Sequence, residues 1–137
     1  MLARPIHLMT SLLIAATFLF VVPDARSEEL PEGVKVTVIA EYKSRVPNMD
    51  KVRLVRVLME PGAVFDNVEI KNEEYCELRK GTLTHTNHAT GITDVFTAGA
   101  RWAPPKNDRH TVINTGDEVA EMWVYQLIEK GQEGSKM

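Results

Sequence analysis

The chain has 137 residues, a net charge of −3 with its histidines neutral, and 44% hydrophobic residues. These values are ordinary for a single globular domain and argue against a disordered chain. No basic stretch with interleaved aromatic residues occurs, so we expect no nucleic-acid partner.

The first 27 residues predict a secretory signal peptide. Arg4 gives a positive start, Leu8–Val22 is an apolar run, and small residues at Ala25 and Ser27 suit the cleavage positions. The run is short for a membrane span, which needs about 20 apolar residues; an uncleaved anchor is the alternative. We therefore expect cleavage after Ser27, a periplasmic or secreted location, and no membrane association afterwards.

Cys76 is the only cysteine of the chain. A single cysteine cannot form an intrachain disulfide, so the stability of the exported domain must come from its core. We expect Cys76 to be a small buried apolar residue. A reactive thiol or an intermolecular bridge is the alternative.

The remaining 110 positions, residues 28–137, read as one all-β domain with its core at about 52–128. Alternation of apolar and polar residues predicts strands over Val34–Ala40 and Val52–Met59, separated by a loop over Glu41–Asp50. Further short strands follow, over Ala63–Ile70, Glu74–Arg79, Thr82–Asn87, Ile92–Thr97, Arg101–Ala103, His110–Asn114 and Val119–Ile128. Turn residues separate these runs, and no stretch has helical periodicity, which indicates a β-sandwich or barrel.

One stretch carries a specific spacing. Gly99 is followed by five residues and then Pro105, and His110 and Asn114 follow at fixed distances. This spacing resembles the second motif of the cupin superfamily, G(X)5PXG(X)2H(X)3N. Asn107 stands where that motif has glycine, and asparagine is the usual substitute where a left-handed backbone is needed.

The resemblance implies a single jelly-roll barrel in which the histidine of the motif, here His110, is a metal ligand. The first cupin motif, G(X)5HXH(X)3–4E(X)6G, is kept only in part. Glu74 holds the place of its carboxylate, with six residues between it and Gly81. The two histidines of the motif are absent. In the alignment that we prefer, which keeps Gly62 close to the distance that the motif sets between its first glycine and first histidine, Asn67 and Glu69 hold their places. The other alignment, which we prefer less, puts Val68 and Ile70 there.

With the preferred alignment, the resemblance implies a metal site of Glu69, Glu74 and His110, supported by Asn67. One imidazole with several oxygen ligands suits hard divalent ions such as Mn²⁺, Mg²⁺ or Ca²⁺ better than copper. Whichever ligand set applies, the resemblance implies one divalent ion as the cofactor, with manganese, iron, nickel and zinc as candidates. If Glu69 is not a metal ligand, it is a surface charge. If His110 is not a metal ligand, it is a hydrogen-bonded core residue.

His85 offers a way to restore a second imidazole. If it points inward with Leu83, it could join Glu74 and His110 as a two-histidine, one-carboxylate set; otherwise it is a solvated hairpin residue. Position in the predicted strands makes further residues candidates for ligand binding in the barrel: Asn67, Cys76, Arg101 and Trp102. We expect Arg109 to face away from the site and His88 to be exposed.

Three functions remain open at this point. The first is an exported cupin that binds a small polar or anionic ligand, through a divalent metal or without one. The second is a metal-dependent enzyme on the same scaffold, such as a dioxygenase, isomerase or lyase. The third is a metal-free, non-catalytic protein. Fold analogy cannot choose among them. Cupins often pair through an edge strand, so we expect a homodimer.

Overall fold

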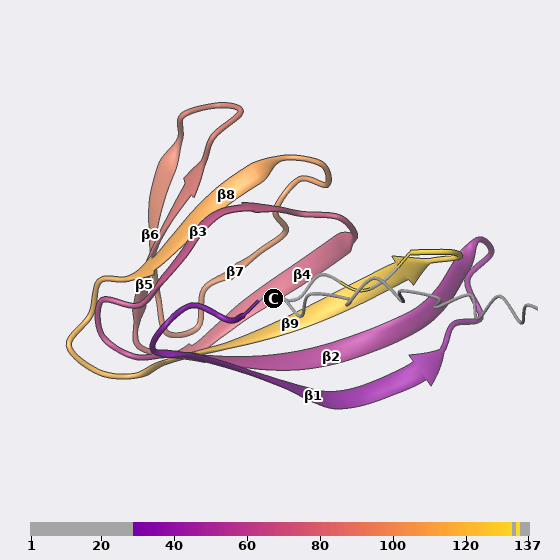
Figure 1. Cartoon of the computed structure of the whole chain (residues 1–137), viewed down its shortest axis with the longest axis horizontal. Coiled ribbons are helices and arrows are strands. Elements are labelled where there is room, and N and C mark those ends of the chain that lie inside the picture. The colour runs from indigo at the N-terminus through magenta and orange to yellow at the C-terminus, as the bar shows by residue number, and fades with distance from the viewer. Residues whose placement is uncertain (1–28, 133, 135–137) are drawn as a thin grey trace, which may run out of the picture.

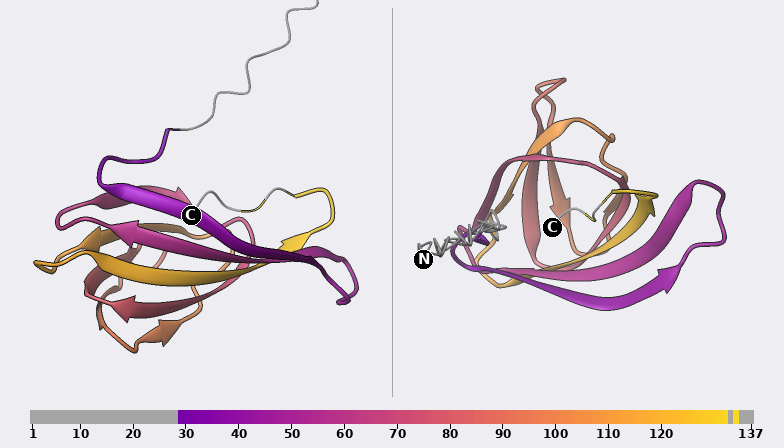
Figure 2. Two further views of the ribbon diagram at one scale, coloured as in Figure 1. Left: turned by 90° about the horizontal axis from the view of Figure 1, so that it is seen from below. Right: turned by 45° about the vertical axis from the view of Figure 1, so that its right-hand side comes forward.

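The computed structural model describes residues 29–132 and 134, and these residues form two antiparallel β-sheets that face each other (Figures 1 and 2). The predicted signal peptide, residues 1–27, lies outside them. The strands are β1 (Val34–Lys43), β2 (Met49–Met59), β3 (Val64–Glu69), β4 (Glu73–Lys80), β5 (Thr82–Asn87), β6 (Thr93–Thr97), β7 (Arg101–Trp102), β8 (Arg109–Asn114) and β9 (Ala120–Glu129). The described part of the chain is all-β, as the sequence predicts. No helix capable of crossing a membrane is found among these residues.

One sheet has five strands in the order β1-β2-β9-β4-β7, and the other has four in the order β3-β8-β5-β6. Alternation decides which side chains face the interior. On β9, every second residue from Ala120 to Ile128 is buried, and its neighbours are partly exposed. The core between the sheets contains the following fully buried side chains: Val55, Val57, Met59, Leu78, Leu83, Met122 and Val124.

Two asparagines of the second motif have visible structural roles. Asn107 has a φ of 70°, the left-handed conformation for which the motif usually has glycine. The side chain of Asn114 donates hydrogen bonds to the carbonyls of Met59 and Glu118, each at 2.8 Å, and is buried. Asn114 thereby ties the end of β8 to the neighbouring chain segments and fixes the position of the strand that carries His110.

One predicted boundary was wrong. Half of the loop expected over residues 41–50 is strand, because β1 runs to Lys43 and β2 begins at Met49. Strand β3 contains a bulge: its register with β8 shifts between Phe65 and Val68, and Asn67 has a φ of 52°. A bulge of this kind reverses which residues face inward.

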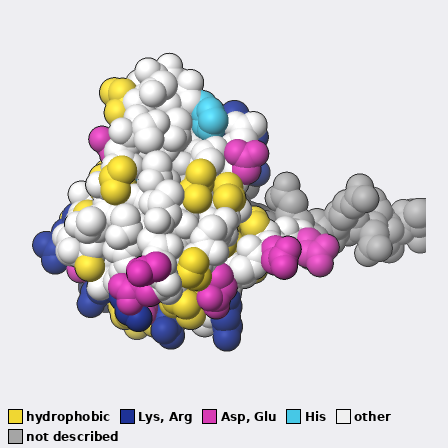
Figure 3. Space-filling view, turned by 90° about the vertical axis from the view of Figure 1, so that its left-hand side faces the viewer, with side chains coloured by type: hydrophobic (Ala, Val, Ile, Leu, Met, Phe, Trp, Pro, Cys, Tyr) yellow, Lys and Arg dark blue, Asp and Glu magenta, His cyan; other side chains and the backbone are white. Residues whose placement is uncertain are grey.

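The surface carries charges of both signs. On the face seen in Figure 3, acidic and basic side chains lie intermingled around the lower part, with hydrophobic side chains scattered between them. That face therefore has no large field of a single sign.

Candidate ligand site

Two histidines meet in the interior. His110 comes from β8 and is 1% exposed, and His85 comes from β5 and is 7% exposed. The two strands are neighbours, and His85 pairs with Val112, two residues after His110. His110 Nδ1 lies 2.8 Å from His85 Nε2, with the ring centroids 4.7 Å apart, so one ring donates a hydrogen bond to the other. His85 therefore faces inward, as the restored-imidazole hypothesis requires.

The surroundings of this pair favour the neutral form of both imidazoles. Burial is the largest cause that lowers the pKa of His85, to about 4, and the adjacent His110 lowers it further, whereas Asp94 opposes both. Burial also lowers the pKa of His110, against the effects of Asp108 and the Pro105 carbonyl. Two imidazoles in direct contact would repel each other strongly if both were positively charged. The lowering of both pKa values therefore agrees with the geometry.

Aromatic side chains flank the pair. Trp102 on β7 stacks on Phe96 on β6, with ring centroids 4.2 Å apart and an interplanar angle of 14°. The His85 ring lies 5.8 Å from Phe96 and 6.3 Å from Trp102, measured between centroids. The sequence indicated Trp102 as a candidate for ligand binding but not Phe96. Phe96 could have been suspected because it is the only aromatic residue in the run Ile92–Thr97.

Glu74 faces the interior but belongs to a separate contact. It is 5% exposed on β4, and its Oε1 accepts a hydrogen bond of 3.0 Å from Gln126 Nε2. The carboxylates that act on the two imidazoles are Asp94 and Asp108. Cys76, two residues along β4, is buried in the core, and burial together with Glu74 raises the pKa of its thiol. The sequence predicted the burial of Cys76.

Asn67 and Glu69 do not face the interior, and the alignment that placed them there was wrong. Both side chains are exposed on β3. Asn67 lies at the bulge, where Arg109 Nε donates to its Oδ1 at 2.9 Å. After the bulge, the inward positions belong to Val68, which packs against the core, and Ile70, which is 1% exposed. The inward positions are thus those of the less preferred alignment, and apolar residues hold both of them.

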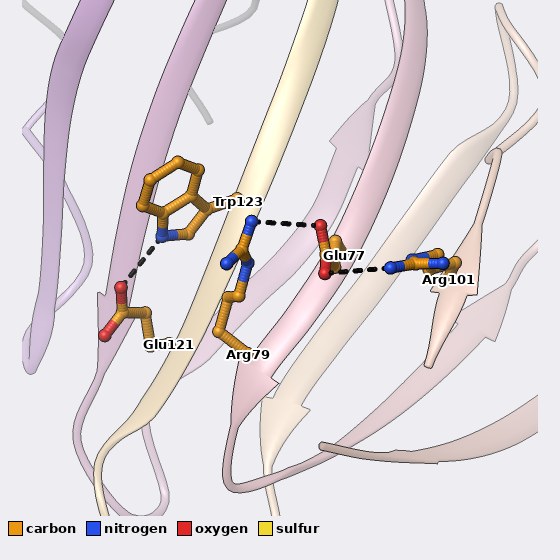
Figure 4. Close-up of polar contacts among 5 residues, drawn as sticks. All are labelled: Glu77, Arg79, Arg101, Glu121 and Trp123. Carbon is orange, nitrogen blue, oxygen red and sulfur yellow. Dashed lines mark hydrogen bonds and ion pairs between the residues drawn. The ribbon is translucent and has the colours of Figure 1, made fainter. Parts of the chain in front are cut away.

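Arg101 also lies outside the barrel. It pairs with Glu77 in the β4–β7 register, next to the inward pair of Cys76 and Trp102, so alternation turns it outward. Its Nη2 lies 3.4 Å from Glu77 Oε1, and Glu77 also binds Arg79 (Figure 4). Arg101 is thus part of an ion-pair row on the outer face. Arg109 and His88 are exposed, as expected.

The donor groups do not fit a closed metal site. Within residues 29–132 and 134, no three or more His, Cys, Asp or Glu side chains are grouped to hold an ion. The facing nitrogens of His85 and His110 are bonded to each other rather than directed at a third point, and Glu74 is bonded to Gln126. A structural or catalytic site normally needs at least three protein ligands. The predicted set of Glu69, Glu74 and His110 is therefore not brought together.

Comparison with known proteins identifies the fold. No family model matches the sequence, and no curated protein matches it. Solved structures do match. A cupin 2 conserved barrel domain protein from Salinispora arenicola superposes with a TM-score of 0.58 at 18% identity, over 72% of this chain and 79% of that one. The cupin domain of Schizosaccharomyces pombe Cnp3 gives 0.59 at 18% identity, over 75% and 70%.

Enzymes share the same architecture. An oxalate oxidase in complex with the substrate analogue glycolate gives a TM-score of 0.58 at 21% identity, over 73% of this chain and 53% of that chain. This chain thus spans about half of the oxalate oxidase. At these identities the likeness concerns the fold and leaves the activity open. Together with the motif around His110 and the two facing sheets, it identifies this chain as having the fold of the cupin superfamily.

Proposed function

We propose that this chain is an exported cupin that binds a small polar or anionic ligand inside its barrel, at the His85–His110 pair. The ligand would contact the imidazoles directly and lie beside Trp102 and Phe96. The observation that carries this proposal is a buried polar atom: His85 Nδ1 has no hydrogen-bond partner among the described residues.

A buried polar atom without a partner costs about 1–3 kcal/mol. Buried polar groups in native proteins are almost always paired, so each exception calls for an explanation. A ligand that bonds to His85 Nδ1 would remove this cost. The neighbouring aromatic rings support the same proposal, since small-molecule sites combine an apolar wall with a few placed polar groups.

The test is a thermal-shift screen of the purified protein against small polar and anionic compounds, with elemental analysis of the same samples. We expect a compound that raises the Tm of the wild type and of the exposed-histidine control His88→Gln, but not of His85→Gln or His110→Gln. Manganese, iron, nickel or zinc at one ion per chain, lost in Glu74→Gln and His110→Gln, would instead support a metal-dependent enzyme. No response to any compound and no metal would favour the non-catalytic alternative.

We also propose that two copies of this chain form a homodimer through an edge strand. β1 is an edge strand, and Val38, Ile39 and Tyr42 on it are exposed by 54%, 46% and 69%. An exposed edge strand with large apolar side chains pairs readily with another chain. Sedimentation of the wild type and of Tyr42→Asp tests this, with a dimer expected for the former and a weakened dimer for the latter. A wild type that stays monomeric at high concentration would contradict it.

A further inference from the structure

The two sheets differ in what they present on their outer faces. On the four-stranded sheet, threonines hold outward positions and their hydroxyls are hydrogen-bonded, Thr84 to Thr115 and Thr86 to Thr93. A polar outer face of this kind is usual for an antiparallel sheet whose other face covers the core. The five-stranded sheet departs from this rule over part of its outer face.

The departure is an apolar patch that runs across β1, β2, β9 and β4. On β9 every second residue is buried, so the residues between them point outward. Their partners on the neighbouring strands lie on the same face of the sheet. Large apolar side chains thereby share adjacent rows of the outer face, and together they form the apolar patch: Tyr42 on β1, Val52 and Leu54 on β2, Tyr125 and Leu127 on β9, and Tyr75 on β4.

The patch is accessible and its centre is ordered. Tyr42 and Tyr75 are exposed, the other members are partly exposed, and the rings of Tyr75 and Tyr125 lie 6.2 Å apart between centroids. Contiguous apolar surface on the outside of a domain marks a contact with another molecule. The edge pairing of β1 cannot cover it, because two antiparallel edge strands join their sheets into one, with both outer faces on the same side.

The charges that border the patch fit a second copy of this chain. In the adjacent row, Arg56 on β2 and Glu77 on β4 lie on either side of Trp123 on β9 (Figure 4 shows Glu77 and Trp123). A two-fold axis along β9 would place β2 of each copy opposite β4 of the other, and therefore Arg56 opposite Glu77 on both sides of the axis. A closed dimer needs a surface that complements itself in this way.

We propose that a second copy of this chain covers the apolar patch in a face-to-face contact, with the two-fold axis along β9. Sheets that pack face to face keep their strands within about 30° of each other. Leu54 of one copy then lies against Tyr75 of the other, and the two Tyr125 side chains lie near the axis. This contact is separate from the edge pairing proposed above and does not depend on ligand binding.

Sedimentation equilibrium of the purified protein tests the contact. Tyr75→Lys and Leu54→Lys should each raise the dissociation constant of the assembly at least about tenfold. The matched control is Val95→Lys, which places the same charge at a 65% exposed apolar position on the other sheet and should leave the assembly unchanged. Unchanged association of both patch variants, or a wild type that stays monomeric at high concentration, would overturn the inference.

Two further variants separate this contact from the edge pairing and test its axis. Val38→Lys alters the exposed β1 edge on the side opposite the patch, since Val38 pairs with the buried Val55. If Val38→Lys alone dissociates the assembly, the edge pairing stands and the face contact is wrong. Arg56→Glu should weaken the face contact and the double variant with Glu77→Arg should restore it; a double variant as weak as Arg56→Glu would overturn the proposed axis.

Discussion

His85 Nε2 and His110 Nδ1 lie 2.8 Å apart, although the two residues are 25 positions apart in the sequence. Neighbouring strands bring them together in the interior, where both side chains are buried. Burial lowers the pKa of both rings, and His110 lowers that of His85 further. The interior of this cupin-fold chain therefore favours a neutral hydrogen-bonding pair, where the resemblance implied a metal site.

Acidification should destabilise the fold through this pair. The pKa of His85 falls from its usual 6.5 to about 4 in the folded state, and that of His110 is also lowered. Between pH 6.5 and 4 the unfolded chain therefore binds more protons than the folded chain, so the free energy of unfolding decreases as pH falls. For His85 the expected slope is about 1 kcal/mol per pH unit, and His110 adds to it in the same direction.

Urea unfolding between pH 7.5 and 4.5 measures this slope, and His85→Gln and His110→Gln should flatten it. His88→Gln is the control for the loss of an exposed histidine; because His88 is only the last of the causes that act on the pKa of His110, we expect it to change the slope less than His85→Gln does. A wild-type slope that equals the slope of His85→Gln would show that the pair is not responsible.

Gly81 and Gly91 should respond differently to the same substitution. Both have positive φ, of 85° and 72°, so alanine is strained at either position. At Gly81 an added Cβ would also lie 2.8 Å from the backbone Cα of Ala120, whereas nothing lies within 4 Å at Gly91. We expect Gly91→Ala to cost about 1–2 kcal/mol and Gly81→Ala clearly more. Equal losses in chemical denaturation would contradict the packing of Gly81 against β9.

Asn114 should be the most sensitive polar residue of the second motif. Replacing it by alanine leaves the carbonyls of Met59 and Glu118 without their donor. Each lost hydrogen bond in a buried place costs about 1–3 kcal/mol, so we expect a total loss of several kcal/mol. Asn107→Gly is the control, because glycine accepts a φ of 70° without strain. A small effect of Asn114→Ala on Tm would argue against this role.

The thiol of Cys76 should be inert in the folded protein. It is 3% exposed, and burial followed by the charge of Glu74 raises its pKa, which suppresses the reactive thiolate. Iodoacetamide at pH 8 should label Cys76 only after unfolding in guanidinium chloride. Fast labelling of the native protein, followed by mass spectrometry, would show that the alternative of a reactive thiol is correct.

Much of the fold could be predicted from the sequence, because the strands alternate regularly and turn residues separate them. The motif around His110 also indicated correctly that Asn107 would be left-handed. Alternation failed at β3, where one bulge moved Asn67 and Glu69 to the exterior and brought Val68 and Ile70 inward. A bulge depends on contacts with other strands, here Arg109 and Thr111 on β8, and leaves no clear local signal.

The site was harder to predict than the fold. The sequence offered Glu74, His85 and His110 as one set, and all three face the interior. The hydrogen-bond partners of these side chains could not be predicted from their spacing in the sequence. Glu74 is bonded to Gln126, and the two histidines are bonded to each other. Arg101 was misplaced because the two-residue strand β7 is too short for its inward face to be read from alternation.

Following both imidazole rings by NMR from pH 8 to pH 4 tests whether His85 and His110 form a single uncharged pair. We predict that His85 stays neutral well below pH 6.5, that the midpoint of His110 also lies below 6.5, and that protonation of one ring shifts the resonances of the other. Two rings that titrate independently near pH 6.5 would contradict it.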